Sequence, residues 1–257
     1  MIRRILLTAT VVLLSGGLLG SYFYFAGRLD AEGRRTARCQ RIRVFMPDSL
    51  ETAIVEPAEV EKFVSRLAAG RVTDSIDLDT IERALRTRGE VMNAQVYALS
   101  PEEIAVRITQ RKPVVRFDDG HRRFYADPEG YLFPVHNAVD VPVVTGKIPM
   151  TLEADYKGPA PEAAAEWVKG VVALARQIDA NAYLRREIAQ IEVESPDELV
   201  LYTRTEGPRF LFGSSDGVPE KFRKMDVYWR NIAPEAEREE KHYSTINLKY
   251  NNQIICK

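Results

Sequence analysis

The order of apolar and polar positions divides this chain into one uniformly hydrophobic run and a long body in which the two kinds of residue alternate. Residues 5–26 read ILLTATVVLLSGGLLGSYFYFA and contain no charged side chain. A helix rises about 1.5 Å per residue, so this run is about 30 Å long, enough to cross the hydrocarbon core of a bilayer. The run therefore predicts a single transmembrane helix, whose membrane residues include Ile5, Leu13, Leu18, Tyr22 and Phe25.

A cleaved signal peptide is the alternative interpretation of this run. Signal peptides have an apolar region of about 7–15 residues and end in small residues at the cleavage site. This run is longer and ends in the aromatic cluster 22–25, a residue type enriched at membrane interfaces. The pattern favours an uncleaved anchor, followed by a polar, arginine-rich spacer over residues 27–38. Arginines flank the run on both sides, so their distribution does not fix its orientation.

The first part of the body predicts a small domain. Residues 41–45 alternate as a strand does, and a helix opens at Pro57 with an apolar stripe at Val60, Phe63, Val64 and Leu67. A second helix is predicted to begin near Asp79, with Glu82 completing a capping box. Two strands follow, over residues 91–99 and 104–109. The first of them is predicted to place Met92, Ala94, Val96 and Ala98 on one face. The order is β-α-α-β-β, a small sheet with two helices on one face.

The remainder of the body is richer in strands. Short strands are predicted over residues 114–117, 122–126, 131–133, 141–145, 188–193, 199–204 and 209–212, and helices over 161–178 and 219–232. In the last helix, Phe222, Met225, Trp229 and Ile232 share the apolar face, which leaves Tyr228 off it. Residues 243–255 are predicted to form one terminal strand, with Ile246, Leu248 and Tyr250 on one side and Thr245, Asn247, Lys249 and Asn251 on the other.

Composition narrows the class of protein. A hydrophobic fraction of 45% and a charged fraction of 28% are those of a folded protein, and the body is long enough for one large or two modest domains. The formal net charge of −1 gives no overall attraction to nucleic acid. The two cysteines, Cys39 and Cys256, are too few for a disulfide scaffold and can pair only if the fold brings them within about 7 Å.

No pattern in the sequence predicts catalytic chemistry. The three histidines have no ligand spacing, and neither cysteine has a nucleophile signature. Residues 213–217, GSSDG, lack the lysine of a phosphate loop and are better explained as a strand-to-helix turn. The carboxylates of Asp127 and Glu129 belong to a predicted turn. We therefore expect no enzyme activity, cofactor, metal or small-molecule substrate.

Taken together, these parts resemble the bacterial cell-division family FtsQ/DivIB. Four segments carry the resemblance, in the family's order: residues 104–117 (IAVRITQRKPVVRF), 125–133 (YADPEGYLF), 211–213 followed by Lys221 and Lys224, and 243–256 (YSTINLKYNNQIIC). The tail before the hydrophobic run is shorter than many relatives carry, which makes a cytoplasmic interaction doubtful.

The resemblance implies an α+β fold with a cytoplasmic tail (residues 1–4), the transmembrane helix (5–26), the spacer (27–38), a POTRA domain (39–112) and a β domain (113–257). It implies a protein of the cell inner membrane at the division septum, with the N-terminus in the cytoplasm and the body in the periplasm. It also implies a non-enzymatic divisome scaffold that contacts other division proteins and binds FtsB, which comes with FtsL, through its last helix and strand.

The sequence offers a physical basis for that partner role. A terminal strand at a sheet edge can accept an added strand, and a basic helix can meet an acidic partner segment. The expected partner-binding residues are Lys221, Lys224, Tyr228, Arg230, Tyr243, Thr245, Asn247, Lys249, Tyr250 and Asn251. The competing interpretation is an interior strand with both edges filled. Two other functions remain open, a POTRA-type outer-membrane assembly or secretion factor and an anchored envelope enzyme.

Overall fold

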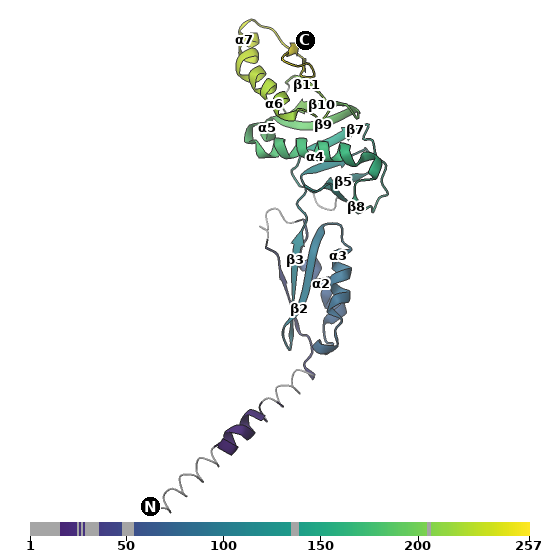
Figure 1. The fold of residues 1–257 in the computed structure, drawn as a ribbon, viewed down its shortest axis with the longest axis vertical. Coiled ribbons are helices and arrows are strands. Elements are labelled where there is room, and N and C mark those ends of the chain that lie inside the picture. The colour runs from purple at the N-terminus through teal and green to yellow at the C-terminus, as the bar shows by residue number, and fades with distance from the viewer. Residues whose placement is uncertain are drawn as a thin grey trace, which may run out of the picture. The chain divides into compact units, whose positions relative to one another are not determined.

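The computed structural model describes residues 16–24, 26, 28, 36–47, 54–134, 139–204 and 207–257, and it divides the chain into two compact units, Met1–Gln110 and Arg111–Lys257 (Figure 1). Within the hydrophobic run, residues 16–24 are helical, and the side chains of Leu18 and Tyr22 are exposed. Ile5, Leu13, Phe25 and the tail 1–4 lie outside the described residues. Among the residues that are described, none of the helices has the length and apolar character needed to span a membrane.

The first unit follows the predicted order of elements. It contains β1 (Arg41–Phe45), α2 (Pro57–Ala68), a 3₁₀ turn (Thr73–Ser75), α3 (Leu78–Arg86), β2 (Val91–Ser100) and β3 (Glu103–Gln110). The sheet order is β1-β3-β2, with β1 parallel and β2 antiparallel to β3. Both helices lie on one side of this sheet (Figure 1), where Val60, Val64 and Leu85 are fully buried together with the sheet residues Ile104 and Val106.

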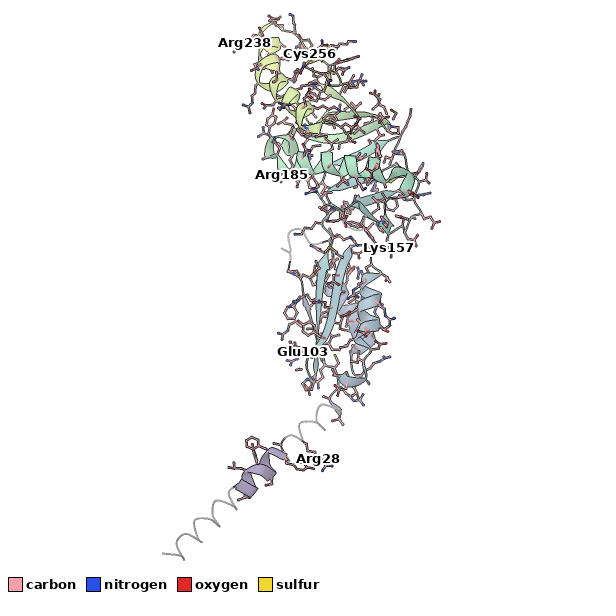
Figure 2. All side chains as sticks on the ribbon, viewed as in Figure 1. Arg28, Glu103, Lys157, Arg185, Arg238 and Cys256 are labelled. Carbon is pink, nitrogen blue, oxygen red and sulfur yellow. The ribbon has the colours of Figure 1, made fainter. Side chains whose placement is uncertain are left out.

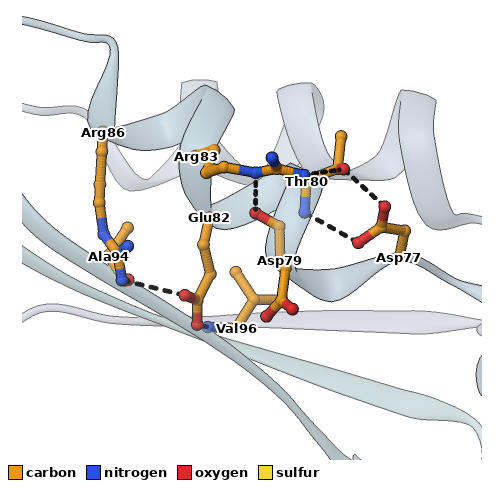
Figure 3. Close-up of polar contacts among 8 residues, drawn as sticks. All are labelled: Asp77, Asp79, Thr80, Glu82, Arg83, Arg86, Ala94 and Val96. Atoms are coloured by element: carbon orange, nitrogen blue, oxygen red, sulfur yellow. Dashed lines mark hydrogen bonds and ion pairs between the residues drawn. The ribbon is translucent and has the colours of Figure 1, made fainter.

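The start of α3 differs from the prediction (Figure 3). Asp77, not Asp79, caps the helix: its carboxylate accepts hydrogen bonds from the Thr80 backbone N at 3.0 Å and the Thr80 hydroxyl at 2.6 Å. Glu82 does not complete a capping box. Its carboxylate accepts from the Val96 backbone N at 2.7 Å and pairs with Arg86 at 2.9 Å. Because β2 is an edge strand, its outer N–H groups need other partners, and Glu82 supplies one.

The prediction that four residues of β2 share one buried face is correct for only two of them. Ala94 and Val96 are buried, but Met92 is 56% exposed and Ala98 is also exposed. The pairing of β2 with β3 shifts register between Val91 and Asn93. Such a bulge turns the side chains on its two sides out of simple alternation, so Val91 takes the buried place predicted for Met92.

The second unit is built on one ten-stranded sheet of order β13-β12-β11-β10-β9-β7-β4-β5-β6-β8. Three of its pairings are parallel, β4 with β7, β7 with β9 and β11 with β12. Its strands are β4 (Val115–Asp118), β5 (Arg123–Ala126), β6 (Tyr131–Pro134), β7 (Val143–Gly146), β8 (Gly158–Pro159), β9 (Ile188–Ser195), β10 (Glu198–Thr203), β11 (Arg209–Gly213), β12 (Thr245–Asn247) and β13 (Ile255–Cys256).

The helices of the second unit supply its core. The predicted helix 161–178 is a 3₁₀ turn (Glu162–Ala164) followed by α4 (Ala165–Ala180), and α5 (Ala182–Glu187) comes next. Val168, Val171 and Ile178 on α4 are fully buried in one cluster with strand residues such as Phe117 and Phe212. The predicted helix 219–232 becomes α6 (Val218–Val227), a π-helical turn (Tyr228–Ile232) and α7 (Ala233–Arg238). The chain is therefore an α+β protein, as predicted.

A buried ion pair stabilises Arg111, the first residue of the second unit. Arg111 pairs with Asp127 at 2.5 Å, and its guanidinium carbon lies 3.4 Å from the centre of the Tyr131 ring. The second carboxylate oxygen of Asp127 accepts from the backbone N of Glu129 and of Tyr131. Asp127 is 1% exposed and serves the β5–β6 turn, as predicted.

Candidate partner-binding site

The predicted terminal strand over residues 243–255 is wrong, because the chain folds back on itself there. β12 pairs in parallel with β11, and β13 returns antiparallel to β12, with Ile246 opposite Cys256. The turn between them contains Asn252 at φ +55°, a backbone conformation that asparagine tolerates better than most residues. β12 is thus an interior strand, and β13 forms this edge of the sheet (Figure 2 labels Cys256).

The hydrogen bonds of β13 show which backbone groups remain available. Thr245 N donates to Lys257 O at 3.0 Å, and Lys257 N donates to Thr245 O at 2.9 Å. In an antiparallel ladder the bonded and non-bonded residues alternate, so the N–H and C=O of Cys256 point away from β12. The edge therefore offers one donor and one acceptor at Cys256, flanked by the half-buried Ile254 and Ile255.

Lys224, predicted to contact a partner, is instead buried beneath the terminal segment. Only 8% of Lys224 is exposed. Its ammonium donates to the carbonyl O of Tyr250 at 2.6 Å and of Leu248 at 3.3 Å, and it pairs with Glu220 at 3.2 Å. A buried ammonium needs such acceptors, and these three fill its capacity. Lys224 therefore fastens α6 to the turn that follows β12.

Two other predicted lysines also make contacts within the unit. Lys249 forms a two-point ion pair with Glu198, at 2.8 and 3.0 Å, and its backbone N donates to the side chain of Asn247. Lys221 donates to Ser214 O at 2.7 Å and lies 4.8 Å from the centre of the Phe212 ring. Burial lowers the pKa of Lys221 below the usual lysine value.

The expectation that Tyr228 lies off the apolar face is also wrong. Tyr228 is 5% exposed and meets the ring of Phe210 edge to face at 5.6 Å. Trp229 is only partly buried, with its ring 5.0 Å from that of Tyr183 on α5. The π-helical turn that begins at Tyr228 changes the number of residues per turn, so a periodicity of 3.6 no longer assigns the faces.

A groove between α5 and α6 was not predicted. It has a volume of about 590 Å³ and is lined by Asn181, Tyr183, Leu184, Pro219, Phe222, Arg223, Asp226, Trp229 and Arg230. The predicted residue Arg230 lies on its rim and pairs with Asp226 at 2.7 Å. The sequence could not reveal this groove, because it depends on the packing of two helices that are far apart in the chain.

The other predicted residues lie along the terminal segment. Tyr250 is 52% exposed and Asn251 is exposed, whereas Tyr243, Thr245 and Asn247 are half-buried. Thr245 also accepts a hydrogen bond from Arg209 on β11 at 3.2 Å. The structure therefore gathers the predicted residues around β12, β13 and α6, where Arg230, Tyr250 and Asn251 are all exposed.

The described residues contain no cluster of histidine, cysteine, aspartate or glutamate that could hold a metal ion. Cys39 and Cys256 are free thiols, and burial raises the pKa of both. A thiol with a raised pKa is a poor nucleophile at neutral pH. The site is therefore a surface of backbone edge, aromatic rings and exposed polar groups.

Comparison with known proteins identifies the relatives of this chain. The family model described as FtsQ/DivIB, C-terminal related, matches residues 112–257, more than half of the chain and nearly all of the second unit. The chain is 27% identical over 191 residues to the protein named Cell division protein FtsQ from Streptomyces bingchenggensis, covering 73% of this chain and 68% of that relative. It is 22% identical over 224 residues to the protein of the same name from Koribacter versatilis, covering 84% of this chain and 61% of that relative. The chain belongs to the FtsQ/DivIB family.

Proposed function

We propose that this chain is a non-enzymatic, membrane-anchored scaffold of the cell-division machinery, which binds the ectodomains of FtsB and FtsL through the β13 edge and the groove beside α6. The observation that carries this proposal is the open sheet edge at Cys256. Family membership supports the division role, and the hydrophobic run supports an anchor in the inner membrane.

The remaining parts of the proposal follow from the resemblance. The first unit would be the POTRA domain (39–112) and the second the β domain (113–257), both in the periplasm at the septum, with the N-terminus in the cytoplasm. The β-α-α-β-β order of the first unit and the large sheet of the second are compatible with that assignment.

The edge suits a partner that adds a strand. An incoming extended segment would pair with the N–H and C=O of Cys256 and extend the ten-stranded sheet by one. The exposed ring of Tyr250 and the partly buried ring of Trp229 offer the aromatic contacts that dominate many protein interfaces. Strand addition supplies affinity from the backbone, and these side chains would supply specificity.

The test is calorimetric titration of the full chain in detergent with the FtsB–FtsL ectodomains. Cys256→Pro removes the outward N–H while sparing the bonds to β12, because Cys256 is not a hydrogen-bonded position. Cys256→Ala is the matched control, since it changes the side chain and keeps the N–H. We expect the proline variant to bind about tenfold more weakly, a loss of about 1.4 kcal/mol, and the alanine variant to bind normally.

Circular dichroism of both variants checks that the unit remains folded. Equal binding by the proline and alanine variants would refute strand addition at β13. Failure of the intact chain to bind FtsB–FtsL would refute the choice of partner. Location at the septum is tested separately by a fluorescent fusion, and diffuse fluorescence around the envelope would contradict a division role.

A further inference from the structure

In the described part of the first unit, one face of the three-stranded sheet is not covered by a helix. Ile104, Val106 and Ile108 on β3 face α2 and α3 and are fully buried. Side chains alternate along a strand, so Glu103, Ala105 and Arg107 point to the other face. The pairing register adds residues of β1 and β2 to that face: Arg41 beside Glu103, Arg43 and Tyr97 beside Ala105, and Phe45 and Gln95 beside Arg107.

This second face carries an excess of positive charge. β1, β2 and β3 contain three arginines, Arg41, Arg43 and Arg107, and one acidic residue, Glu103. The Glu103 carboxylate is 8% exposed and lies 2.8 Å from the guanidinium of Arg43 and 3.6 Å from that of Arg41. It holds both arginines in place while their side chains remain 54% and 68% exposed.

Arg107 completes the charge pattern. Its side chain is exposed, and within the part of the chain that the structure describes, its guanidinium has no ion-pair partner. This face thus carries three positively charged guanidinium groups and one buried, negatively charged carboxylate. A guanidinium binds a phosphate through two parallel N–H donors, so exposed arginines on a flat sheet suit phosphodiester groups arrayed in a plane.

Apolar side chains surround the arginines. Phe45 is 37% exposed, and the Arg43 guanidinium carbon lies 6.0 Å from the centre of its ring. Leu99, beside the register shift at the end of β2, is 46% exposed. Tyr97, two residues before Leu99, is half-buried. Arginine beside aromatic and aliphatic side chains is the composition of surfaces that rest in the headgroup layer of a membrane.

We propose that this arginine face, formed by Arg41, Arg43, Phe45, Tyr97 and Arg107, binds anionic lipid headgroups. The inference rests on the proposed membrane anchor, because chain continuity keeps the face near the bilayer. Residues 27–40 separate β1 from the hydrophobic run, and even fully extended they span only about 50 Å. A tether of this length lets the face reach the bilayer surface, where anionic lipids attract basic groups within about a Debye length.

The test uses the full chain in nanodiscs of either pure zwitterionic lipid or a mixture with anionic phosphatidylglycerol. A polarity-sensitive dye is attached at Gln95→Cys, an exposed position beside Arg107, in a Cys256→Ser background; Cys39 is 1% exposed and is protected from labelling. We expect the dye emission to shift to shorter wavelength only in the anionic nanodiscs, and salt to reverse the shift.

Two variants separate the arginine face from overall charge. Arg43→Gln with Arg107→Gln should abolish the shift. Lys62→Gln with Arg66→Gln removes the same charge from exposed positions on α2 and should leave the shift intact. Arg107→Gln alone breaks no ion pair among the described residues and should reduce the shift by about half.

The outcomes distinguish this inference from the proposed function. A chain that inserts into both nanodiscs but shows equal emission in both overturns the arginine face and leaves the anchor standing. An equal loss of the shift in the α2 variant also overturns it, because the effect would then come from net charge. A chain that does not insert overturns the anchor and this inference together.

Discussion

Replacing Lys224 by methionine should loosen the terminal segment while leaving the rest of the second unit intact. The Lys224 ammonium reaches two backbone carbonyls of the turn after β12, those of Tyr250 at 2.6 Å and Leu248 at 3.3 Å. Methionine is nearly as long as lysine and keeps the apolar packing of the stem. The substitution therefore removes the hydrogen bonds and leaves the space filled.

The expected magnitude follows from those two contacts. A hydrogen bond from a charged donor contributes about 1.5–3 kcal/mol, and the longer bond to Leu248 is the weaker of the two. Removing the buried ammonium also removes its desolvation cost, which offsets part of the loss. The ion pair with the 41%-exposed Glu220 side chain adds little. We expect the free energy of local opening to fall by about 2 kcal/mol, which is about a 30-fold faster exchange of the protected amides.

Hydrogen exchange followed by mass spectrometry, on the full chain in detergent, measures the free energy of local opening of the terminal segment. Peptides covering residues 245–257 should exchange faster in Lys224→Met, and peptides from α4 and β9 should be unchanged. Lys221→Met is the matched control, because Lys221 lies on the same helix but donates to Ser214 O instead. Unchanged exchange over 245–257 in Lys224→Met would refute the view that this lysine fastens the terminal segment. Equal acceleration throughout the second unit would show a global role instead.

Three further predictions concern the two units separately. Asp77→Ala should speed amide hydrogen exchange in α3, whereas Asp79→Ala should not. Hydrogen bonds from Thr80 lower the pKa of Asp77, so the contribution of Asp77 to the stability of α3 should be complete above the ordinary pKa of about 3.9. That contribution should disappear as the pH falls through the lowered pKa. Gly170→Ala should destabilise the second unit by about 1–3 kcal/mol in urea, since a Cβ there would lie 2.9 Å from that of Ser215, and Ser215→Gly should restore stability. Asp127→Ala should cost about 3 kcal/mol because it leaves Arg111 without its buried partner, whereas Asp140→Ala, at an 89%-exposed side chain, should be near neutral.

The elements that the sequence predicted are those whose burial repeats with a regular local period. The stripe residues Val60 and Val64 on α2 are buried as predicted, and Ile104, Val106 and Ile108 are buried along the strand predicted over residues 104–109. Periodicity therefore suffices for the order of elements and for the α+β class.

The wrong predictions occur where a local irregularity of the backbone interrupts the periodic burial of side chains. A bulge beside Met92, a π-helical turn at Tyr228 and a left-handed asparagine at 252 each shift the residues that follow. None of these has a sequence signal stronger than the hydrophobic pattern around it. At α3, both Asp77 and Asp79 are capping residue types, and in the structure Asp77 bonds to Thr80 while Glu82 bonds to β2 instead of completing a capping box. The burial of Lys224 could not be predicted for a related reason, because only the tertiary fold brings two carbonyls to its ammonium.

These corrections change how the terminal segment could serve a partner. The predicted strand would have offered its own side chains, lysines included, on an open edge. In the structure, β12 is enclosed by β11 and β13, and the ammonium groups of Lys224 on α6 and Lys249 in the turn bond within the unit. The surface proposed for a partner therefore consists of the short edge at Cys256, the exposed ring of Tyr250 and the groove between α5 and α6. Lys224 bonds to the carbonyl of Tyr250 itself, so a loss of partner binding in Lys224→Met would result from displacement of Tyr250 and of the β13 edge. Partner affinity should then fall in proportion to the increase in amide hydrogen exchange over residues 245–257.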